Sequence, residues 1–131
     1  MGRELRKILF VDDDQDVHMI VKLCLREIPN LEFRSAFSGQ EAISISQEFL
    51  PDLILLDVMM PKMDGIETLR ALKQIPSLKN TAVVFLTAKA VRSEVENFLK
   101  YGVVEVITKP FDALTLSKEV LEIWNRINNK E

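Results

Sequence analysis

Short apolar runs alternate with longer amphipathic segments along the whole chain. Five runs have the length and apolar content of strands: Lys7–Val11, Leu31–Ala36, Leu53–Leu56, Ala82–Leu86 and Val103–Ile107. Short continuous apolar runs are typical of strands that are buried on both faces of a parallel sheet. The second run mixes polar and apolar residues, so we expect it to lie at an edge of that sheet.

The segments between the runs carry apolar residues at helical spacing. The first has a single apolar stripe formed by Val17, Ile20, Val21, Cys24, Leu25 and Ile28. Three later segments repeat this spacing, with Ile66, Leu69 and Leu72, then Val91, Val95, Phe98 and Leu99, and finally Leu116, Val120, Ile123 and Ile127. One more helix is expected from Ser38, which can cap it with Glu41 as its capping-box partner, to about Phe49.

Five strand–helix repeats predict an α/β fold. Right-handed crossovers place such strands side by side in one parallel sheet with helices on both faces. We expect a doubly wound, flavodoxin-like (βα)5 arrangement with the strand order 2-1-3-4-5. The 131 residues suit a single domain spanning residues 1–131, with its core at about residues 5–128.

Composition and charge argue against several classes of function. The net charge is −3 with acids and bases intermixed, so no basic stripe indicates direct nucleic-acid binding. No apolar run approaches the ~18 residues of a membrane span. The single cysteine, Cys24, cannot form an internal disulfide and lies in an apolar stripe, which predicts a buried, inert thiol. We therefore expect a cytoplasmic protein without a membrane partner.

Polar residues capable of chemistry follow four of the five apolar runs. They are Asp12, Asp13 and Asp14 after the first run, Asp57 after the third, Thr87 after the fourth and Lys109 after the fifth. In a doubly wound sheet the ligand site lies at the carboxyl ends of the strands, so these side chains are expected to converge on one crevice. Each could separately be a cap, a turn residue or a surface residue, but their joint placement favours a common site.

The residues of this crevice have the chemistry of a phosphoryl-transfer site. Clustered carboxylates repel one another and need a counter-charge, and hard oxygen ligands with room for water favour Mg²⁺. Lys109 supplies a fixed positive charge and Thr87 a hydroxyl. Asp57 can itself be the nucleophile, as in enzymes that form an aspartyl phosphate.

Four segments resemble the signature segments of two-component response-regulator receiver domains: Ile8–Asp14, Leu55–Gly65, Phe85–Ala88 and Ile107–Phe111. The resemblance covers roughly residues 5–128. It implies a phosphoacceptor switch, in which a sensor histidine kinase or a histidine phosphotransfer protein donates the phosphoryl group. The domain would catalyse only its own phosphorylation and dephosphorylation.

The resemblance also assigns roles to individual residues. It implies that Asp57 is the phosphoacceptor, and that Asp12, Asp13, Asp57 and the backbone carbonyl of Met59 hold Mg²⁺. Thr87 matches the hydroxyl that moves toward the phosphoryl group on activation, and Lys109 the lysine that pairs with Asp57. The Lys109–Pro110 bond resembles the cis peptide of the family.

Three features depart from or extend the pattern of the family. Val106 stands where the family usually has an aromatic residue that swings inward, so we expect switching to rely on Thr87 and the fourth helix, without compensation by Tyr101. Met59 and Lys89 flank the site and are expected to slow hydrolysis of the phosphoryl group.

Two further groups of residues lie outside these motifs. We interpret His18 as a surface or packing residue. Leu114, Leu121 and Trp124 add apolar area to the last helix, which indicates core packing more than a docking face.

Two other functions remain open at this stage. The absence of the switch aromatic favours a phosphorylation-independent interaction module. A small-molecule phosphohydrolase would place a second acid two residues after the nucleophile, where this chain has Met59. The downstream protein partner is not specified by the sequence, and a homodimer is one arrangement that it allows.

Overall fold

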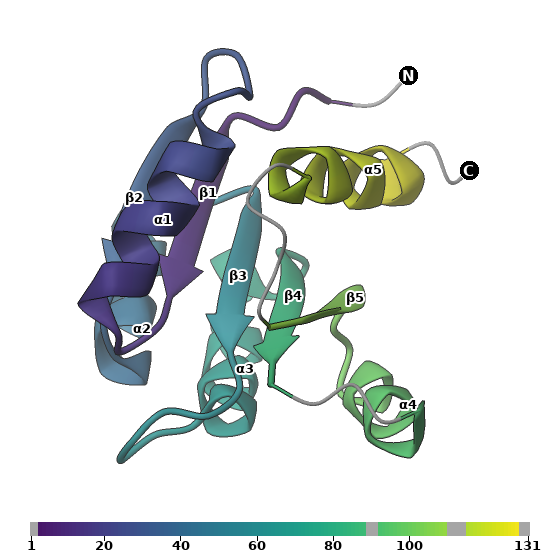
Figure 1. Ribbon diagram of the computed structural model, residues 1–131. Coiled ribbons are helices and arrows are strands. Elements are labelled where there is room, and N and C mark those ends of the chain that lie inside the picture. Colours follow the sequence, from purple (N-terminus) through teal and green to yellow (C-terminus); the bar gives the residue numbers. More distant parts are fainter. Residues whose placement is uncertain (1–2, 89–91, 110–114, 129–131) are drawn as a thin grey trace.

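The computed structural model describes residues 3–88, 92–109 and 115–128. Five parallel strands form one sheet in the order β2-β1-β3-β4-β5, as predicted (Figure 1). The strands are β1 (Lys7–Val11), β2 (Glu32–Ala36), β3 (Leu53–Asp57), β4 (Ala82–Thr87) and β5 (Glu105–Thr108). The predicted doubly wound, flavodoxin-like α/β fold is therefore confirmed, and the mixed second strand does lie at an edge.

Helices cover both faces of this sheet. They are α1 (Gln15–Leu25), α2 (Gly39–Phe49), α3 (Gly65–Lys73), α4 (Arg92–Lys100) and α5 (Leu116–Asn128), with a short 3-10 helix, η1 (Pro76–Leu78), after α3. α1 and α5 pack on one face, and α2, α3 and part of α4 on the other. In the described part of the chain, every helix is too short or too polar to cross a lipid bilayer.

Alternate residues of each central strand enter the two cores. Phe10 and Leu55 point toward α1 and α5, whereas Leu9 and Ile54 point toward α2 and α3. All four are fully buried. Burial on both faces explains why β1, β3 and β4 read as continuous apolar runs rather than as alternating ones.

Several predicted boundaries and contacts need correction. β2 begins at Glu32 rather than Leu31, and β5 spans Glu105–Thr108 rather than Val103–Ile107. Ile20 was expected in the core stripe of α1 but is 49% exposed, because the packed side of the helix is centred on Val21, Cys24 and Leu25.

The first turn of α2 also differs from the prediction. Ser38 accepts a hydrogen bond from the Glu41 N–H, as expected for an N-cap. The Glu41 carboxylate, however, accepts from the Phe37 N–H and not from Ser38. The reciprocal capping box occurs at α3 instead, between Asp64 and Glu67.

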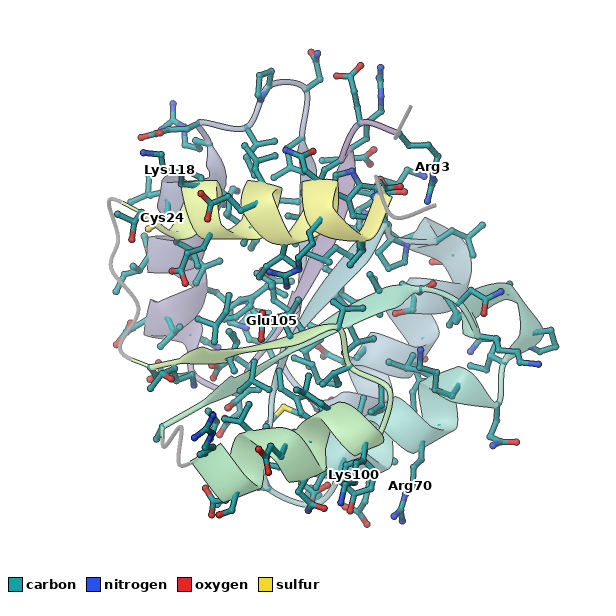
Figure 2. The ribbon with its side chains drawn as sticks, turned by 90° about the vertical axis from the view of Figure 1, so that its right-hand side faces the viewer. Arg3, Cys24, Arg70, Lys100, Glu105 and Lys118 are labelled. Atoms are coloured by element: carbon teal, nitrogen blue, oxygen red, sulfur yellow. The ribbon has the colours of Figure 1, made fainter. Side chains whose placement is uncertain are left out.

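The apolar residues of α5 and the cysteine of α1 belong to the core. Trp124 is buried and Leu121 is half-buried against the same cluster, so the core interpretation holds for these two; Leu114 lies outside the described residues. Cys24 is buried in this cluster, on the side of α1 that faces α5 (Figure 2).

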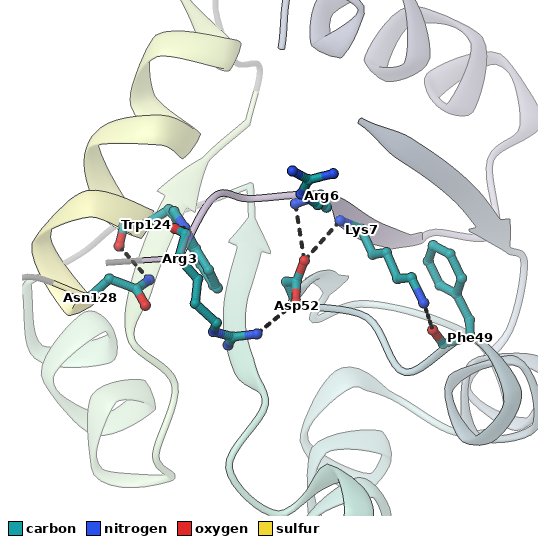
Figure 3. Close-up of polar contacts among 7 residues, drawn as sticks. All are labelled: Arg3, Arg6, Lys7, Phe49, Asp52, Trp124 and Asn128. Carbon is teal, nitrogen blue, oxygen red and sulfur yellow. Dashed lines mark hydrogen bonds and ion pairs between the residues drawn. The ribbon is translucent and has the colours of Figure 1, made fainter. Parts of the chain in front are cut away.

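The amino end of the sheet is held by Asp52, the residue before β3. Its carboxylate accepts hydrogen bonds from the backbone N–H groups of Arg6 and Lys7 at 3.0 Å and pairs with Arg3 at 3.3 Å (Figure 3). The Trp124 indole donates to the Arg3 carbonyl at 2.7 Å. These contacts tie β1, β3 and α5 together at the edge opposite the predicted site.

Candidate functional site

Three carboxylates meet at the carboxyl ends of β1 and β3. Asp12 follows β1 and Asp57 ends β3, and both are almost completely buried, whereas Asp13 is exposed. One carboxylate oxygen from each lies within 4.8 Å of the other two. The predicted convergence of these acids is therefore observed, and the fourth neighbouring acid, Asp14, serves as the N-cap of α1.

Lys109 provides the counter-charge that the acid cluster requires. Its Nζ lies 2.9 Å from Asp12 Oδ2 and 3.3 Å from Asp57 Oδ1, so one ammonium group bridges both buried acids. Its backbone N–H donates to the Thr87 carbonyl at 2.7 Å, which fixes the end of β5 beside the end of β4. Thr87 is itself buried, next to the strand pairing of Asp57 with Leu86.

Burial and charge change the pKa values of this pair. Burial raises the pKa of the Asp57 carboxyl above its usual value, and repulsion by Asp12 adds to the rise, while Lys109 opposes both. Burial alone would lower the pKa of Lys109, but its hydrogen bond and attraction to Asp12 and Asp57 raise it overall. Lys109 therefore stays positively charged, and an additional cation would favour ionised Asp57.

The loops fix the acids through local hydrogen bonds. The Asp12 N–H donates to the Ala36 carbonyl of β2 at 3.1 Å, and the Asp14 N–H donates to the Asp12 carboxylate at 2.9 Å. Asp14 in turn accepts from the Asp16 N–H and starts α1. The acid loop is thus held from both sides, by a strand and by a helix.

Gly65 allows α3 to begin directly against the end of β3. A Cβ atom on Gly65 would lie 2.6 Å from the Asp57 carbonyl oxygen and 2.7 Å from Val58 Cα, and its N–H donates to the Val58 carbonyl at 2.8 Å. Only a residue without a side chain fits this close approach of backbone to backbone. The only signal in the sequence is the Asp64-Gly65 pair, which is typical of a turn and does not indicate this contact.

We expect Gly65→Ala to lower the free energy of unfolding by about 1–3 kcal/mol, because the added methyl overpacks the backbone of β3. Urea unfolding monitored by circular dichroism measures the change. Ser93→Ala on the exposed side of α4 is the control and should change little. Equal stability of the Gly65→Ala variant and the wild type would contradict the close packing described here.

The remaining predicted residues have mixed outcomes. Met59 is 74% exposed, and its backbone N–H donates to Asp57 Oδ1 at 3.4 Å. Lys89 and Pro110 lie outside the described residues, so the roles expected of Lys89 and of the Lys109–Pro110 bond stay predictions.

The position of the missing switch aromatic lies on the outermost strand. Val106 is half-buried on β5, paired with Phe85 of β4, and β5 crosses between α4 and α5 (Figure 2). Tyr101 is half-buried and its ring faces the Arg70 guanidinium at 5.5 Å.

His18 makes a contact that the sequence did not predict. It is 5% exposed and bonds through Nε2 to the Asp12 carbonyl at 2.7 Å and through Nδ1 to Ser35 Oγ at 2.9 Å. Its packing role is confirmed, but the contact with the acid loop was not foreseen. A lone polar ring beside an apolar helical stripe was the only signal available.

A separate concavity lies at the other end of the sheet. A groove of about 680 Å³ at the amino end of the sheet is lined by residues that include Asp52, Lys73 and Trp124. None of the residues of the acid site lines it. Volume alone therefore does not mark the functional site of this protein, and the convergence of charged side chains does.

Comparison with known proteins agrees with this geometry. Residues 8–121 match the response regulator receiver domain family. The chain belongs to the response regulator receiver domain family. Its arrangement of Asp12, Asp13, Asp57 and Lys109 is the one typical of a receiver phosphoacceptor site.

Individual relatives extend the comparison. The chemotaxis protein CheY of Pseudomonas aeruginosa is 33% identical over 122 residues, covering 93% of this chain and 98% of CheY. The transcriptional regulatory protein CpxR of Escherichia coli is 35% identical, and this chain spans about half its length. The Mn²⁺-bound structure of response regulator Rcp1 superposes with a TM-score of 0.74 at 30% identity, covering 96% of each chain.

The acid cluster fits a divalent cation. Three carboxylates with a single lysine leave a net negative charge, and their oxygens lie close enough to share one ion. Such hard oxygen donors suit Mg²⁺ or Mn²⁺. The receiver domain thus has a site able to hold a metal beside its central aspartate.

Proposed function

We propose that Asp57 accepts a phosphoryl group from the phosphohistidine of a sensor histidine kinase or a histidine phosphotransfer protein, in a Mg²⁺-dependent reaction in the cytoplasm. The contact that carries this proposal is the bridge from Lys109 to Asp57 and Asp12 within the acid cluster. The domain spans residues 1–131, and its phosphorylation changes the binding of a downstream protein.

The reaction forms one bond and breaks one. A carboxylate oxygen of Asp57 attacks the phosphorus, the P–N bond of the donor breaks, and its electron pair returns to the imidazole ring of the donor. Asp12, Asp13, Asp57 and the Met59 carbonyl would hold Mg²⁺, which supplies charge stabilisation for the transferring phosphoryl oxygens.

Two side chains of the protein act on the transferring group directly. Lys109 places its ammonium beside the Asp57 carboxylate and offsets the negative charge that accumulates there. Thr87 contributes a hydroxyl that donates a hydrogen bond to the phosphorylated residue. The hydroxyl then draws the end of β4 toward Asp57, which alters the adjoining α4–β5 face.

Phosphorylation is tested with Mg²⁺ and acetyl phosphate, followed by intact-mass spectrometry. We expect a mass gain of one phosphoryl group that requires Mg²⁺ and is absent from Asp57→Asn. Phosphorylation of the Asp57→Asn variant at the wild-type level would overturn the assignment of the acceptor.

A phosphorylation-independent interaction module is the second candidate, and Val106 favours it. A valine on β5 has no ring to swing inward, so the usual coupling between the threonine and an aromatic residue is missing. Beryllofluoride, a mimic of the phosphoryl group, separates the two functions in the presence of Mg²⁺. A phosphorylation switch binds it at Asp57 and shifts the NMR signals of α4 and β5, whereas a phosphorylation-independent module shows neither effect.

Ionisation of Asp57 is expected to destabilise the metal-free protein. Folding raises the pKa of the Asp57 carboxyl. At pH values between its pKa in the unfolded chain and its pKa in the folded protein, the folded state therefore binds more protons than the unfolded state. The free energy of unfolding then falls as the pH rises through that window. Asp57→Asn should therefore be more stable than the wild type at pH 7 in EDTA, by roughly 1 kcal/mol.

Guanidinium unfolding at several pH values measures this difference. The advantage of Asp57→Asn should vanish at acid pH, where Asp57 of the wild type is neutral in both states. Glu122→Gln removes the same charge from the exposed side of α5 and should show no such pH-dependent gain. A constant advantage at every pH would show that ionisation is not its cause.

A further inference from the structure

His18 links the acid loop to the neighbouring strand through a buried imidazole. Nε2 lies 2.7 Å from the Asp12 carbonyl oxygen, and Nδ1 lies 2.9 Å from the Ser35 hydroxyl oxygen of β2. The ring is 5% exposed and packs between Phe10, at 4.5 Å between centroids, and Phe37, at 4.2 Å. The side chain is therefore bonded through both ring nitrogens and packed against two aromatic rings.

The partners of the ring determine its hydrogens. A carbonyl oxygen can only accept, so Nε2 carries a hydrogen and donates it to Asp12. In the neutral ring Nδ1 then accepts the hydroxyl hydrogen of Ser35, which gives a continuous hydrogen-bond chain from β2 to the acid loop. The bond from Nε2 to the Asp12 carbonyl is buried, so that carbonyl would lose its partner if the donor were removed.

The bonded carbonyl belongs to the peptide group that joins Asp12 to Asp13. The other hydrogen-bonding groups of Asp12 are engaged separately: its N–H with Ala36, and its carboxylate with Asp14 and Lys109. His18 fixes the orientation of the following peptide plane. Rotation of that plane would move Asp13, the exposed member of the acid cluster, relative to the two buried members.

We propose that His18 is a positioning residue for the metal site. Through its bond to the Asp12 carbonyl, His18 keeps the Asp13 carboxylate close to the carboxylates of Asp12 and Asp57. This inference rests on the proposed function, because it requires that the three acids bind Mg²⁺. His18 touches neither the metal nor the phosphoryl group; its effect on both passes through the peptide between Asp12 and Asp13.

Three substitutions separate the donor from the bulk of the ring. His18→Gln places an amide nitrogen where Nε2 stands and keeps a donor for Asp12. His18→Asn places its amide nitrogen nearer to Nδ1, on the side of Ser35, and leaves the Asp12 carbonyl without a donor. His18→Leu fills much of the space with no polar group at all.

The dissociation constant for Mg²⁺ is the readout, measured by isothermal titration calorimetry with MgCl₂ alone. We expect His18→Asn and His18→Leu to bind Mg²⁺ about ten-fold more weakly than the wild type. His18→Gln should lie within about three-fold of the wild type, because it restores the donor. Urea unfolding in EDTA gives the stability of each variant independently of the metal.

Two results would overturn the positioning role. One is a wild-type dissociation constant in all three variants together with lowered stability, which is what a packing residue alone would give. The other is equal weakening in His18→Gln and His18→Asn, which would remove the dependence on the donor. If His18→Leu fails to fold, the ratio of the constants of the Gln and Asn variants decides. Absence of Mg²⁺ binding by the wild type would instead overturn the proposed function itself, and this inference with it.

Discussion

Lys109→Met is expected to lower the rate of phosphorylation by roughly 10²–10³-fold, the cost typical of removing a charge aimed at the reacting group. The ammonium lies 3.3 Å from Asp57 Oδ1 and 2.9 Å from Asp12 Oδ2, and no second described lysine or arginine pairs with either acid. Methionine keeps the length and apolar stem of the lysine but removes its charge. The rate is measured from phosphoryl incorporation with acetyl phosphate at fixed Mg²⁺.

The same substitution should destabilise the metal-free protein. The side chains of Asp12 and Asp57 are only 2% and 6% exposed, so removing Lys109 leaves two buried carboxylates without their counter-charge. Breaking a buried pair in this way typically costs about 3 kcal/mol of unfolding free energy. The loss should shrink at acid pH, because burial already raises the pKa of Asp57 and a protonated carboxyl needs no partner.

Lys100→Met is the matched control for this experiment. Lys100 is exposed at the end of α4, away from the acid site (Figure 2). Its loss should leave both the rate and the stability unchanged. Addition of Asp57→Asn to Lys109→Met should recover part of the lost stability, since one of the two orphaned charges is gone. Wild-type rates in Lys109→Met would contradict the role proposed for this lysine.

The sheet and the convergence of its acids could be predicted because two simple rules apply to this chain. Continuous apolar runs such as Leu53–Leu56 become strands that are buried on both faces, and the carboxyl ends of parallel strands share one edge. Asp12, Asp57 and Lys109 each follow such a run, so their meeting depends only on strand order. The strand order in the structure, β2-β1-β3-β4-β5, agrees with the predicted one.

The same two rules could not predict contacts between side chains and the backbone. Periodicity could place Ile20 and His18 on neighbouring parts of α1, but it could not tell which of them faces the sheet. The structure buries the histidine and exposes the isoleucine, because the Asp12 carbonyl and Ser35 provide partners for a polar ring inside the core. Such a partner lies on another strand, and no local pattern reports it.

The close packing at Gly65 illustrates the same limit. An Asp-Gly pair is typical of a turn, yet the reason for this glycine lies in the backbone of Asp57 and Val58, seven or eight residues earlier. An added Cβ atom would lie only 2.6 Å from the Asp57 carbonyl oxygen, and this tertiary contact decides which residue fits there. Functional sites built at strand ends depend on such close approaches, and these become visible only when the strands are placed in space.

Asp13→Asn is expected to weaken Mg²⁺ binding by at least ten-fold, whereas Asp14→Asn should leave it within about three-fold of the wild type. The two substitutions remove the same charge from neighbouring residues of one loop. Only Asp13 lies in the acid cluster with Asp12 and Asp57; the Asp14 carboxylate accepts from the Asp16 N–H and caps α1, a role that asparagine can also fill. Calorimetric titration with MgCl₂ measures both constants, and low ionic strength is avoided so that long-range attraction is screened.

The comparison distinguishes coordination from general electrostatics. If the acids acted only through their summed negative charge, both variants would lose affinity equally, and the geometry of the cluster would be irrelevant. If Asp13 is a direct ligand, only Asp13→Asn should weaken Mg²⁺ binding. The same substitution should also relieve repulsion among the acids in the metal-free protein. Asp13→Asn should then be at least as stable as the wild type in EDTA while gaining less stability from Mg²⁺, because a ligand stabilises the folded state only in proportion to its affinity.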